Sequence, residues 1–270
     1  MIDIRIRLCD TLTSSKAMLE LYHRIANANV TLRGDLEFVN DWDFFTTQPA
    51  QHFEGLVSTG QYAGTLEAFT TGVKLRTRYR HLLDAALEHG ATSFWASDSN
   101  RVIDTARYFA AGFFGIDWKE TATLHVVPET ADHAADTLSP GRTCLNYRQD
   151  VDDFGHAYGY RMLNAFRKTY EPGIVERLAK QNPHFPFTEA EIFTMQQICG
   201  FETIAKESSP WCDVFSQQEW DAFEYSRDLL HYYRAGPGNP FSGSMGWLWL
   251  NATANLLIDG PSAGPLFFSL

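Results

Sequence analysis

The order of apolar and polar positions predicts an α/β unit in the first half of the chain. A short apolar strand at 94–96 runs into a polar turn, and a helix follows whose apolar residues recur every three or four positions. Side-chain oxygens of Asp98, Ser99 or Asn100 can cap this helix. A second strand is predicted at about 121–127. Strands joined by helical crossovers favour a parallel sheet covered on both faces.

Periodicity predicts further elements on either side of this unit. The predicted helices lie at about 14–27, 65–90 and 247–258, and the further strands lie at 2–8 and 266–268. Gly90 is expected to end the second of these helices, because glycine readily takes the conformation of a helix C-cap. From 150 to 233 the pattern is helical, with breaks expected at Pro172, Pro183, Pro186 and Pro210.

These elements predict the α/β class, with a mostly parallel sheet core, helices on both faces and an inserted α-helical cap domain. The core is expected to comprise 1–130 and 245–270, and the cap 131–244. A polar segment at 128–143 and a segment rich in Gly, Pro and Ser at 236–246 suggest the connections.

Composition indicates a globular protein without a broad basic surface. The chain has 270 residues, of which 44% are hydrophobic and 14% aromatic, and its net charge is −11. Nucleic acid is therefore not an expected partner. No apolar run is long enough to cross a bilayer, and the first 13 residues lack the apolar core of a signal peptide. As written, the sequence predicts a cytoplasmic chain.

The turn before the helix that follows 94–96 is a candidate phosphate site. Free N–H groups and the helix dipole both favour an anion at a helix N-terminus. Arg101 lies in the first turn of this helix and can add a full positive charge. The alternative is that every α/β unit has such a turn and that Arg101 is an ordinary surface residue.

Family resemblance extends over most of the chain. Five blocks carry it in a constant order: 13–45, 56–83, 93–115, 198–240 and 248–270. The most specific block reads ICGFETIAKESSPWCDVFSQQEWDAFEYSRDLLHYYRAGPGNP. Together they resemble the histidine acid phosphatases, in particular the fungal secreted acid phosphatases related to phytases. The resemblance implies hydrolysis of small phosphate esters in an extracellular setting. The sequence lacks the CxxC and HxxxH spacings of a zinc site, so we expect no metal and no cofactor.

The chain departs from this family at the two catalytic motifs. The resemblance implies a histidine nucleophile in an R-H-G-x-R-x-P turn and a proton donor in a later H-D pair. The nucleophile position is Arg7, and Ile6 and Asp10 stand where flanking arginines are expected. The chain stops at Leu270, where the H-D pair would follow. We therefore expect little or no phosphatase activity and assign no catalytic residue.

Two other functions stay open. One is a shortened form of an active secreted phosphatase, and the other is a non-catalytic protein that binds phosphate or sugar phosphates. Other histidines are weaker candidates for a nucleophile: His89 is expected at a helix end, His81 within a helix, and His156 and His231 in the helical cap.

Cysteines and sequons add expectations about modification. The cysteines are Cys9, Cys144, Cys199 and Cys212. The resemblance implies a disulfide between Cys199 and Cys212 and a partner for Cys144 beyond this chain; two buried free thiols are the alternative. N-glycosylation sequons begin at Asn29 and Asn251.

Overall fold

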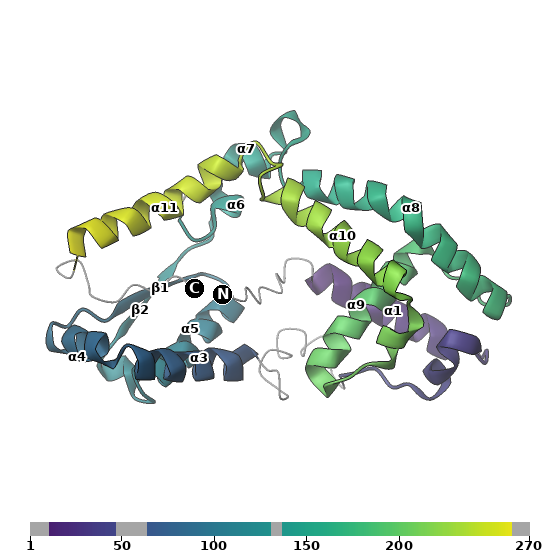
Figure 1. Ribbon diagram of the computed structural model, residues 1–270, viewed down its shortest axis with the longest axis horizontal. Helices are drawn as coiled ribbons and strands as arrows, with labels where there is room; N and C mark the ends of the chain where they lie inside the picture. Colours follow the sequence, from purple (N-terminus) through teal and green to yellow (C-terminus); the bar gives the residue numbers. More distant parts are fainter. Residues whose placement is uncertain (1–10, 47–63, 131–136, 261–270) are drawn as a thin grey trace. The chain divides into compact units, whose positions relative to one another are not determined.

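The computed structural model describes residues 11–46, 64–130 and 137–260 (Figure 1). Contacts divide the chain into two compact units. The first unit comprises 1–63 and 162–229, and the second comprises 64–161 and 230–270. The boundaries of core and cap expected from the sequence stay a prediction.

The first unit is helical. Its elements are α1 (Thr11–Asn27), the 3-10 helix η1 (Gly34–Asp41), most of α8 (Ala157–Gln181), α9 (Glu189–Lys206), η4 (Pro210–Val214) and most of α10 (Gln217–Arg234). They enclose a core that includes Met18, Leu36, Leu178, Ile192, Met195 and Trp211, each fully buried. The ring of Trp211 packs edge to face against the rings of Phe38 and Trp42, so aromatic packing holds η1 against η4.

Helix α9 begins at a capping box. The Thr188 hydroxyl accepts from the amide of Glu191, and the Glu191 carboxylate accepts from the amide of Thr188 at 2.8 Å. The same carboxylate accepts a hydrogen bond from Arg24 of α1, whose Nε lies 2.6 Å from Oε1 of Glu191. One glutamate therefore both starts α9 and links it to α1.

Pro172 does not break its helix, contrary to the sequence-based expectation. Helix α8 continues through it from Ala157 to Gln181. A proline inside a helix removes one N–H donor, and the loss can be offset by packing. Leu163, Ile174 and Leu178 are buried along α8, so tertiary burial accompanies the uninterrupted helix. Pro183, Pro186 and Pro210 lie outside α-helices, as expected.

The second unit is an α/β unit. Its elements are α3 (Gly64–Arg78), α4 (Arg80–Glu88), β1 (Ser93–Ser97), α5 (Asn100–Phe113), η2 (Trp118–Glu120), β2 (Thr123–Val127), α6 (Pro140–Thr143), α7 (Leu145–Arg148), η3 (Val151–Asp153) and α11 (Ser242–Asp259). The strands are parallel, in a register from Ser93 opposite Thr123 to Ser97 opposite Val127. Phe94 and Ala96 are fully buried with apolar residues of α3, α4 and α5.

Two expected boundaries differ from the structure, and a third agrees. The helix predicted over 65–90 is two helices, α3 and α4, separated at Tyr79, whose backbone departs from helical values (φ −117°, ψ 30°). No glycine or proline lies at this break, so the sequence pattern alone predicts one continuous helix. Gly90 does follow the second helix, with φ +62°. Helix α11 begins at Ser242, so the preceding loop is shorter than expected.

Fold class agrees with the expectation: the chain combines a small parallel sheet with helices, and most of the described residues are helical. The strands predicted at 2–8 and 266–268 lie outside the described residues.

Candidate anion-binding site

The carboxyl ends of β1 and β2 lie at one edge of the sheet, because the strands are parallel. The amide of Asp98 donates to the carbonyl of Val127 at 2.9 Å, and the amide of Ser99 donates to the carbonyl of Ser97 at 2.8 Å. These bonds fix the turn that leads into α5. In open parallel sheets, ligands bind outside this edge.

Helix α5 starts at this edge without a side-chain cap from its N-cap residue. Ser99 occupies the N-cap position with extended dihedrals (φ −119°, ψ 129°), but its hydroxyl makes no capping hydrogen bond. The expectation that a side chain here caps the helix is therefore wrong for the N-cap residue Ser99. Its amide is held in the preceding turn instead. The positive end of the helix dipole is thus left without a Ser99 cap.

Arg101 lies in the first turn of α5, where the sequence placed it, and is half-buried. The hydroxyl of Thr105 donates to the Arg101 carbonyl at 2.8 Å within the helix. Further along α5, Arg107 is exposed and pairs with Asp104 at 3.2 Å. The two arginines differ in position and exposure on the same helix. Arg107 therefore serves as a control for substitutions of Arg101.

A carboxylate follows β2 near the same edge. Glu129 comes two residues after Val127, and its Oε2 lies 2.9 Å from Nε of Arg142. The Glu129 side chain is 16% exposed, so this pairing compensates a partly desolvated charge. Pairing also weakens the repulsion that Glu129 would exert on an anion nearby. Sequence patterning gave no signal of this contact.

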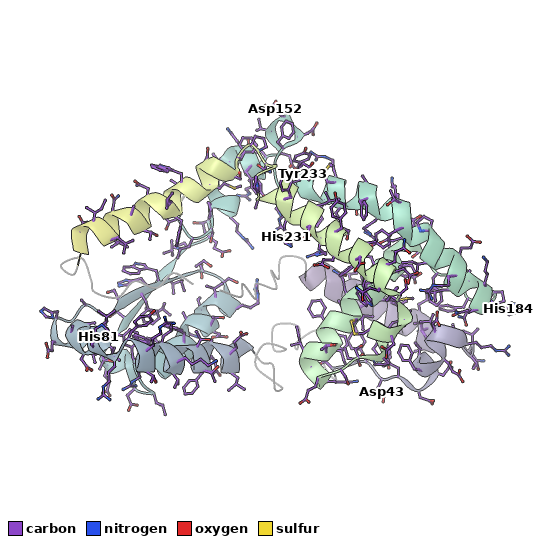
Figure 2. All side chains as sticks on the ribbon, in the orientation of Figure 1. Asp43, His81, Asp152, His184, His231 and Tyr233 are labelled. Atoms are coloured by element: carbon purple, nitrogen blue, oxygen red, sulfur yellow. A yellow bond between two sulfur atoms is a disulfide. The ribbon has the colours of Figure 1, made fainter. Side chains whose placement is uncertain are left out.

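The candidate histidines do not make a nucleophile at this edge. His81 and His231 are exposed on α4 and α10 (Figure 2). His89 follows α4, and its Nδ1 lies 2.7 Å from the carbonyl of Ala85. Nε2 of His156 accepts from the guanidinium of buried Arg234 at 2.8 Å, which occupies the lone pair that an attacking imidazole needs.

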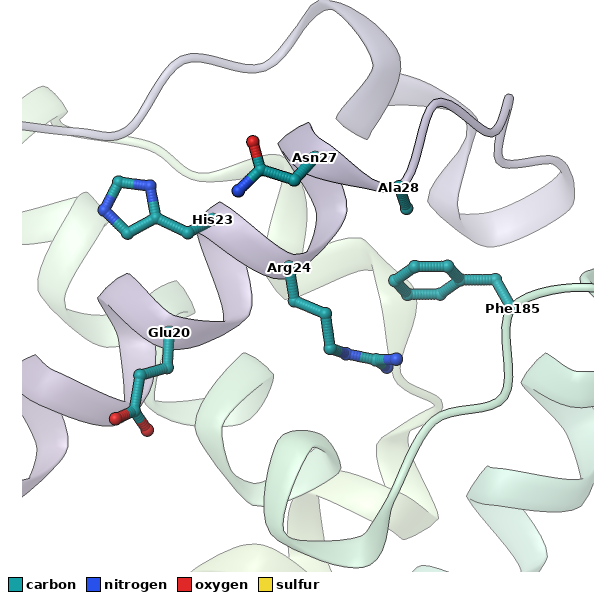
Figure 3. Close-up of a pocket in the computed structure, with 6 residues that line it drawn as sticks. All are labelled: Glu20, His23, Arg24, Asn27, Ala28 and Phe185. Atoms are coloured by element: carbon teal, nitrogen blue, oxygen red, sulfur yellow. The ribbon is translucent and has the colours of Figure 1, made fainter.

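An open pocket of about 580 Å³ lies in the first unit, and Figure 3 shows its lining. The lining residues are Glu20, His23, Arg24, Asn27, Ala28 and Phe185. Arg24 is its strongest positive group, but both Glu191 oxygens accept from it, at 2.6 and 3.0 Å. Its guanidinium also covers the Phe185 ring at 4.1 Å. The guanidinium of Arg24 is therefore already occupied by Glu191 and Phe185, and we propose no anion site in this pocket.

Two neighbouring residues of α8, in the first unit, have raised pKa values. Burial raises the pKa of the Glu171 carboxyl, Arg167 partly offsets that rise, and Glu189 adds to it. Burial likewise raises the pKa of the Tyr170 phenol, and Glu171 adds to the rise. Nε of Arg167 lies 2.6 Å from Glu171, whose other oxygen has no hydrogen-bond partner in the structure. The Glu171 side chain is 1% exposed and that of Arg167 16%, while Tyr170 is partly buried.

The remaining predicted site residues belong to elements other than α5. Cys199 and Cys212 form a disulfide, the pairing that the family resemblance implied. Among the described residues, Cys144 is a free cysteine. Asn29 is exposed in the coil after α1 with φ +48°, whereas Asn251 is exposed within α11. The positions of the expected catalytic turn, including Ile6, Arg7 and Asp10, fall outside the described residues, as does Cys9.

The described residues contain neither a candidate metal site nor a membrane-spanning helix. Across 11–46, 64–130 and 137–260, no group of three or more His, Cys, Asp or Glu side chains could hold a metal ion. In the same ranges, every helix is too short or too polar to span a bilayer.

Comparisons with known proteins agree with the fold. The family described as histidine phosphatase superfamily (branch 2) matches residues 11–265. A phytase of Candida albicans is 31% identical over 262 residues, covering 95% of this chain and 54% of that protein. An acid phosphatase of Komagataella pastoris is 32% identical over 258 residues, covering 94% and 53%. The crystal structure of the phytase from D. castellii superposes with a TM-score of 0.82 at 29% identity, covering 95% of this chain and 56% of that one.

These observations define an α/β protein with a large helical portion. The chain belongs to branch 2 of the histidine phosphatase superfamily. It spans about half the length of the curated relatives that it matches.

Proposed function

We propose that this chain binds small phosphate esters at the carboxyl edge of the β1–β2 sheet, with Arg101 and the first N–H groups of α5 as anion contacts. Family membership supports phosphate as the recognised group. The uncapped Ser99 position at the end of a parallel strand is the observation that carries the location. The proposal needs no cofactor, metal or nucleic acid.

We further propose that these 270 residues alone hydrolyse phosphate esters weakly or not at all. The sequence contains no Arg-His-Gly triplet and no His-Asp pair. Phosphoryl transfer through a histidine requires a nucleophile held among positive groups and an acid that protonates the leaving alcohol. Without these groups, positioning by α5 leaves the chemical step largely uncatalysed.

Two alternatives differ in whether adding the catalytic motifs gives phosphatase activity. If the chain is part of an active secreted phosphatase, adding the missing motifs yields hydrolysis. If it is a non-catalytic protein that binds phosphate or sugar phosphates, it binds these ligands, and adding the catalytic motifs gives no turnover. An extracellular location is part of the first alternative, and the Cys199–Cys212 disulfide favours it because such bonds persist in oxidising compartments.

Calorimetry tests the binding proposal with matched arginine variants. The probes are inorganic phosphate and inositol hexakisphosphate, titrated at millimolar concentration into the wild-type chain, Arg101→Ala and Arg107→Ala. We expect Arg101→Ala to weaken binding roughly ten- to a hundredfold, since a charge-assisted hydrogen bond contributes roughly 1.5–3 kcal/mol. Arg107→Ala should leave the affinity nearly unchanged, because Arg107 pairs with Asp104. No binding by the wild-type chain, or equal loss in both variants, contradicts the proposed site.

A further inference from the structure

Polar side chains join the end of α10 to the start of α8. Arg234 is 6% exposed on the last turn of α10, and its Nη2 lies 2.8 Å from Nε2 of His156, the residue before α8. Nη1 of Arg234 donates to the hydroxyl of Tyr160 on α8 at 3.2 Å. These three residues belong to the second unit. We call the contact between His156 and Arg234 the histidine clasp.

The donor in the histidine clasp is the arginine. A guanidinium carries only N–H groups, has no acceptor and stays protonated in proteins, so Nε2 of His156 must offer its lone pair. The imidazole is therefore neutral, with its proton on Nδ1. An imidazolium has N–H groups at both nitrogens, so it would turn a second donor and a second positive charge toward Arg234. The observed contact thus requires a neutral His156.

Close packing leaves Arg234 little room to move away from a charged ring. A Cβ atom built on Gly159 would stand 2.7 Å from Cβ of Arg234, and closer still to the carbonyl oxygen of Leu230. The end of α10 therefore touches the backbone of α8 three residues after His156. Since Arg234 is held there, the imidazole is the group that must move when it takes up a proton.

A second contact at the same place contains no group that titrates in this range. Asn239 is 2% exposed, and its Nδ2 donates to the carbonyls of Phe154 and Tyr233 at 2.8 and 2.9 Å. Its Oδ1 accepts from the amide of Phe241 at 2.8 Å. An amide side chain keeps its donors and its acceptor at acid pH. Loss of the histidine clasp would therefore loosen the start of α8 without detaching it from the residues after α10.

The other titratable groups on the elements that meet at the clasp are mostly carboxylates, phenols and arginines. They are Tyr147 and Arg148 of α7, Asp150, Asp152 and Asp153 before α8, Tyr158, Tyr160 and Arg161 of α8, and His231, Tyr232 and Tyr233 of α10. The rings of Tyr147 and Tyr160 lie against the imidazole, with ring centres 6.1 and 5.6 Å away. Carboxylates ordinarily titrate below about pH 5 and phenols near about pH 10, whereas imidazole titrates between them. His156 and the exposed His231 are therefore the groups expected to change charge on mild acidification.

We propose that the histidine clasp is a pH-sensitive contact that holds the start of α8 against the end of α10 at neutral pH and releases it in acid. The unfolded chain takes up a proton on His156 near the ordinary imidazole pKa of about 6.5, whereas the clasp needs the neutral ring. Its contribution to stability is therefore fully present above this pH and is lost as the pH falls below it. The proposal is independent of phosphate binding, because no ligand takes part.

Hydrogen exchange of the unliganded 270-residue chain tests the clasp at about pH 7 and about pH 5. Each rate is divided by the intrinsic rate at the same pH, which gives a protection factor. We expect protection of the first α8 amides to fall about tenfold in the wild-type chain. The limit is about thirtyfold, because pH 5 lies about 1.5 pH units below the ordinary imidazole pKa.

Two glutamine variants assign the pH response to one histidine. His156→Gln offers Arg234 a carbonyl acceptor at both pH values, so its protection factors should stay nearly constant. His231→Gln is the matched control, since His231 is exposed three residues before Arg234 on the same helix. It should keep the wild-type fall.

Tyr160→Phe separates the titrating contact from ordinary packing. This variant removes the hydroxyl that accepts from Arg234, a contact that does not titrate between about pH 5 and pH 7. Protection should therefore drop by a similar factor at both pH values. Equal protection of the wild-type chain at both pH values would overturn the proposal. So would a fall in His156→Gln as large as in the wild-type chain, or the loss of that fall in His231→Gln.

Discussion

Gly72 of α3 lies directly against Gly112 of α5. A Cβ atom built on Gly72 would stand 3.1 Å from the carbonyl carbon of Gly112, and closer still to the carbonyl oxygen of Phe109. A Cβ on Gly112 would in turn meet the backbone of Phe69 and Val73. The two helices therefore touch backbone to backbone, and Figure 1 shows them side by side beside the strands. This contact sets how closely α5 packs on α3.

Replacing Gly112 with alanine should loosen this helix pair. The added methyl group overlaps backbone atoms that have no rotamer to move, and overpacking of this kind costs roughly 1–3 kcal/mol. Hydrogen exchange of the α5 amides measures the effect within the second unit. We expect faster exchange along α5 in Gly112→Ala, together with weaker phosphate binding.

Gly200→Ala is the matched control. Gly200 lies in the interior of α9, and a Cβ there would have no atom within 4 Å. Alanine should therefore stabilise α9 by about 0.5–1 kcal/mol through helix propensity. If the α5 amides of Gly112→Ala exchange as slowly as those of the wild-type chain, the close contact does not stabilise α5.

Glu171 should make the first unit more stable at acid pH. Its folded-state pKa is raised by burial, so the contribution of this group is fully present below its ordinary pKa of 4.5. That contribution is lost as pH rises through the raised value, where a charged carboxylate must stay buried. Glu171→Gln keeps an acceptor for Arg167 and should flatten the dependence of unfolding free energy on pH.

The control for Glu171 is Glu176→Gln on the same helix. Glu176 is exposed, and its hydrogen bond with Lys180 lowers the pKa of its carboxyl. Its small contribution therefore appears above its ordinary pKa and is lost on acidification. Urea unfolding between about pH 4 and pH 7 measures both variants. If Glu171→Gln and wild type keep parallel profiles, burial of the charge is not the cause.

The Cys199–Cys212 disulfide should stabilise the first unit. Its cysteines are 13 positions apart and bracket the fully buried Trp211. Closing a loop of this length contributes about 3 kcal/mol in the chain-entropy account. Replacing both cysteines with alanine should lower the unfolding free energy by about that amount, measured with denaturant. Cys144→Ala should change it little, since Cys144 belongs to the second unit and is a free cysteine among the described residues; equal losses would argue against the loop-closure account.

Asn29 should carry a glycan when the chain is expressed in a eukaryotic secretory pathway. It is exposed in coil directly after α1, the kind of segment that a sequon requires. Mass spectrometry before and after deglycosylation, with Asn29→Gln for comparison, measures occupancy. A fully secreted wild-type chain with unmodified Asn29 would contradict this prediction.

The strand–turn–helix of the candidate site could be predicted because local pattern determines it. The apolar 94–96 run, the polar turn and the spacing of Ala106, Phe109 and Phe113 are all readable in sequence, and the burial of these side chains agrees. The parallel pairing of β1 with β2 followed from the length of the crossover. Arg101 at the start of α5 followed from the same pattern.

Other features depend on tertiary contacts that a single sequence does not display. Nothing local marks the break at Tyr79 or the continuation of α8 through Pro172. The pairing of Glu129 with Arg142 and the approach of Gly72 to α5 require the fold itself. By contrast, the Thr-x-x-Glu signature at Thr188 could have located the start of α9, and that signal was missed.

Hydrolysis at acid pH tests the central claim most directly. The purified 270-residue chain is assayed at about pH 5 with p-nitrophenyl phosphate and inositol hexakisphosphate. The claim of phosphate recognition without a complete catalytic centre predicts turnover far below about one per second, the lower end of ordinary enzyme rates. Turnover at or above about one per second, from a preparation in which Arg101→Ala removes it, would contradict that claim.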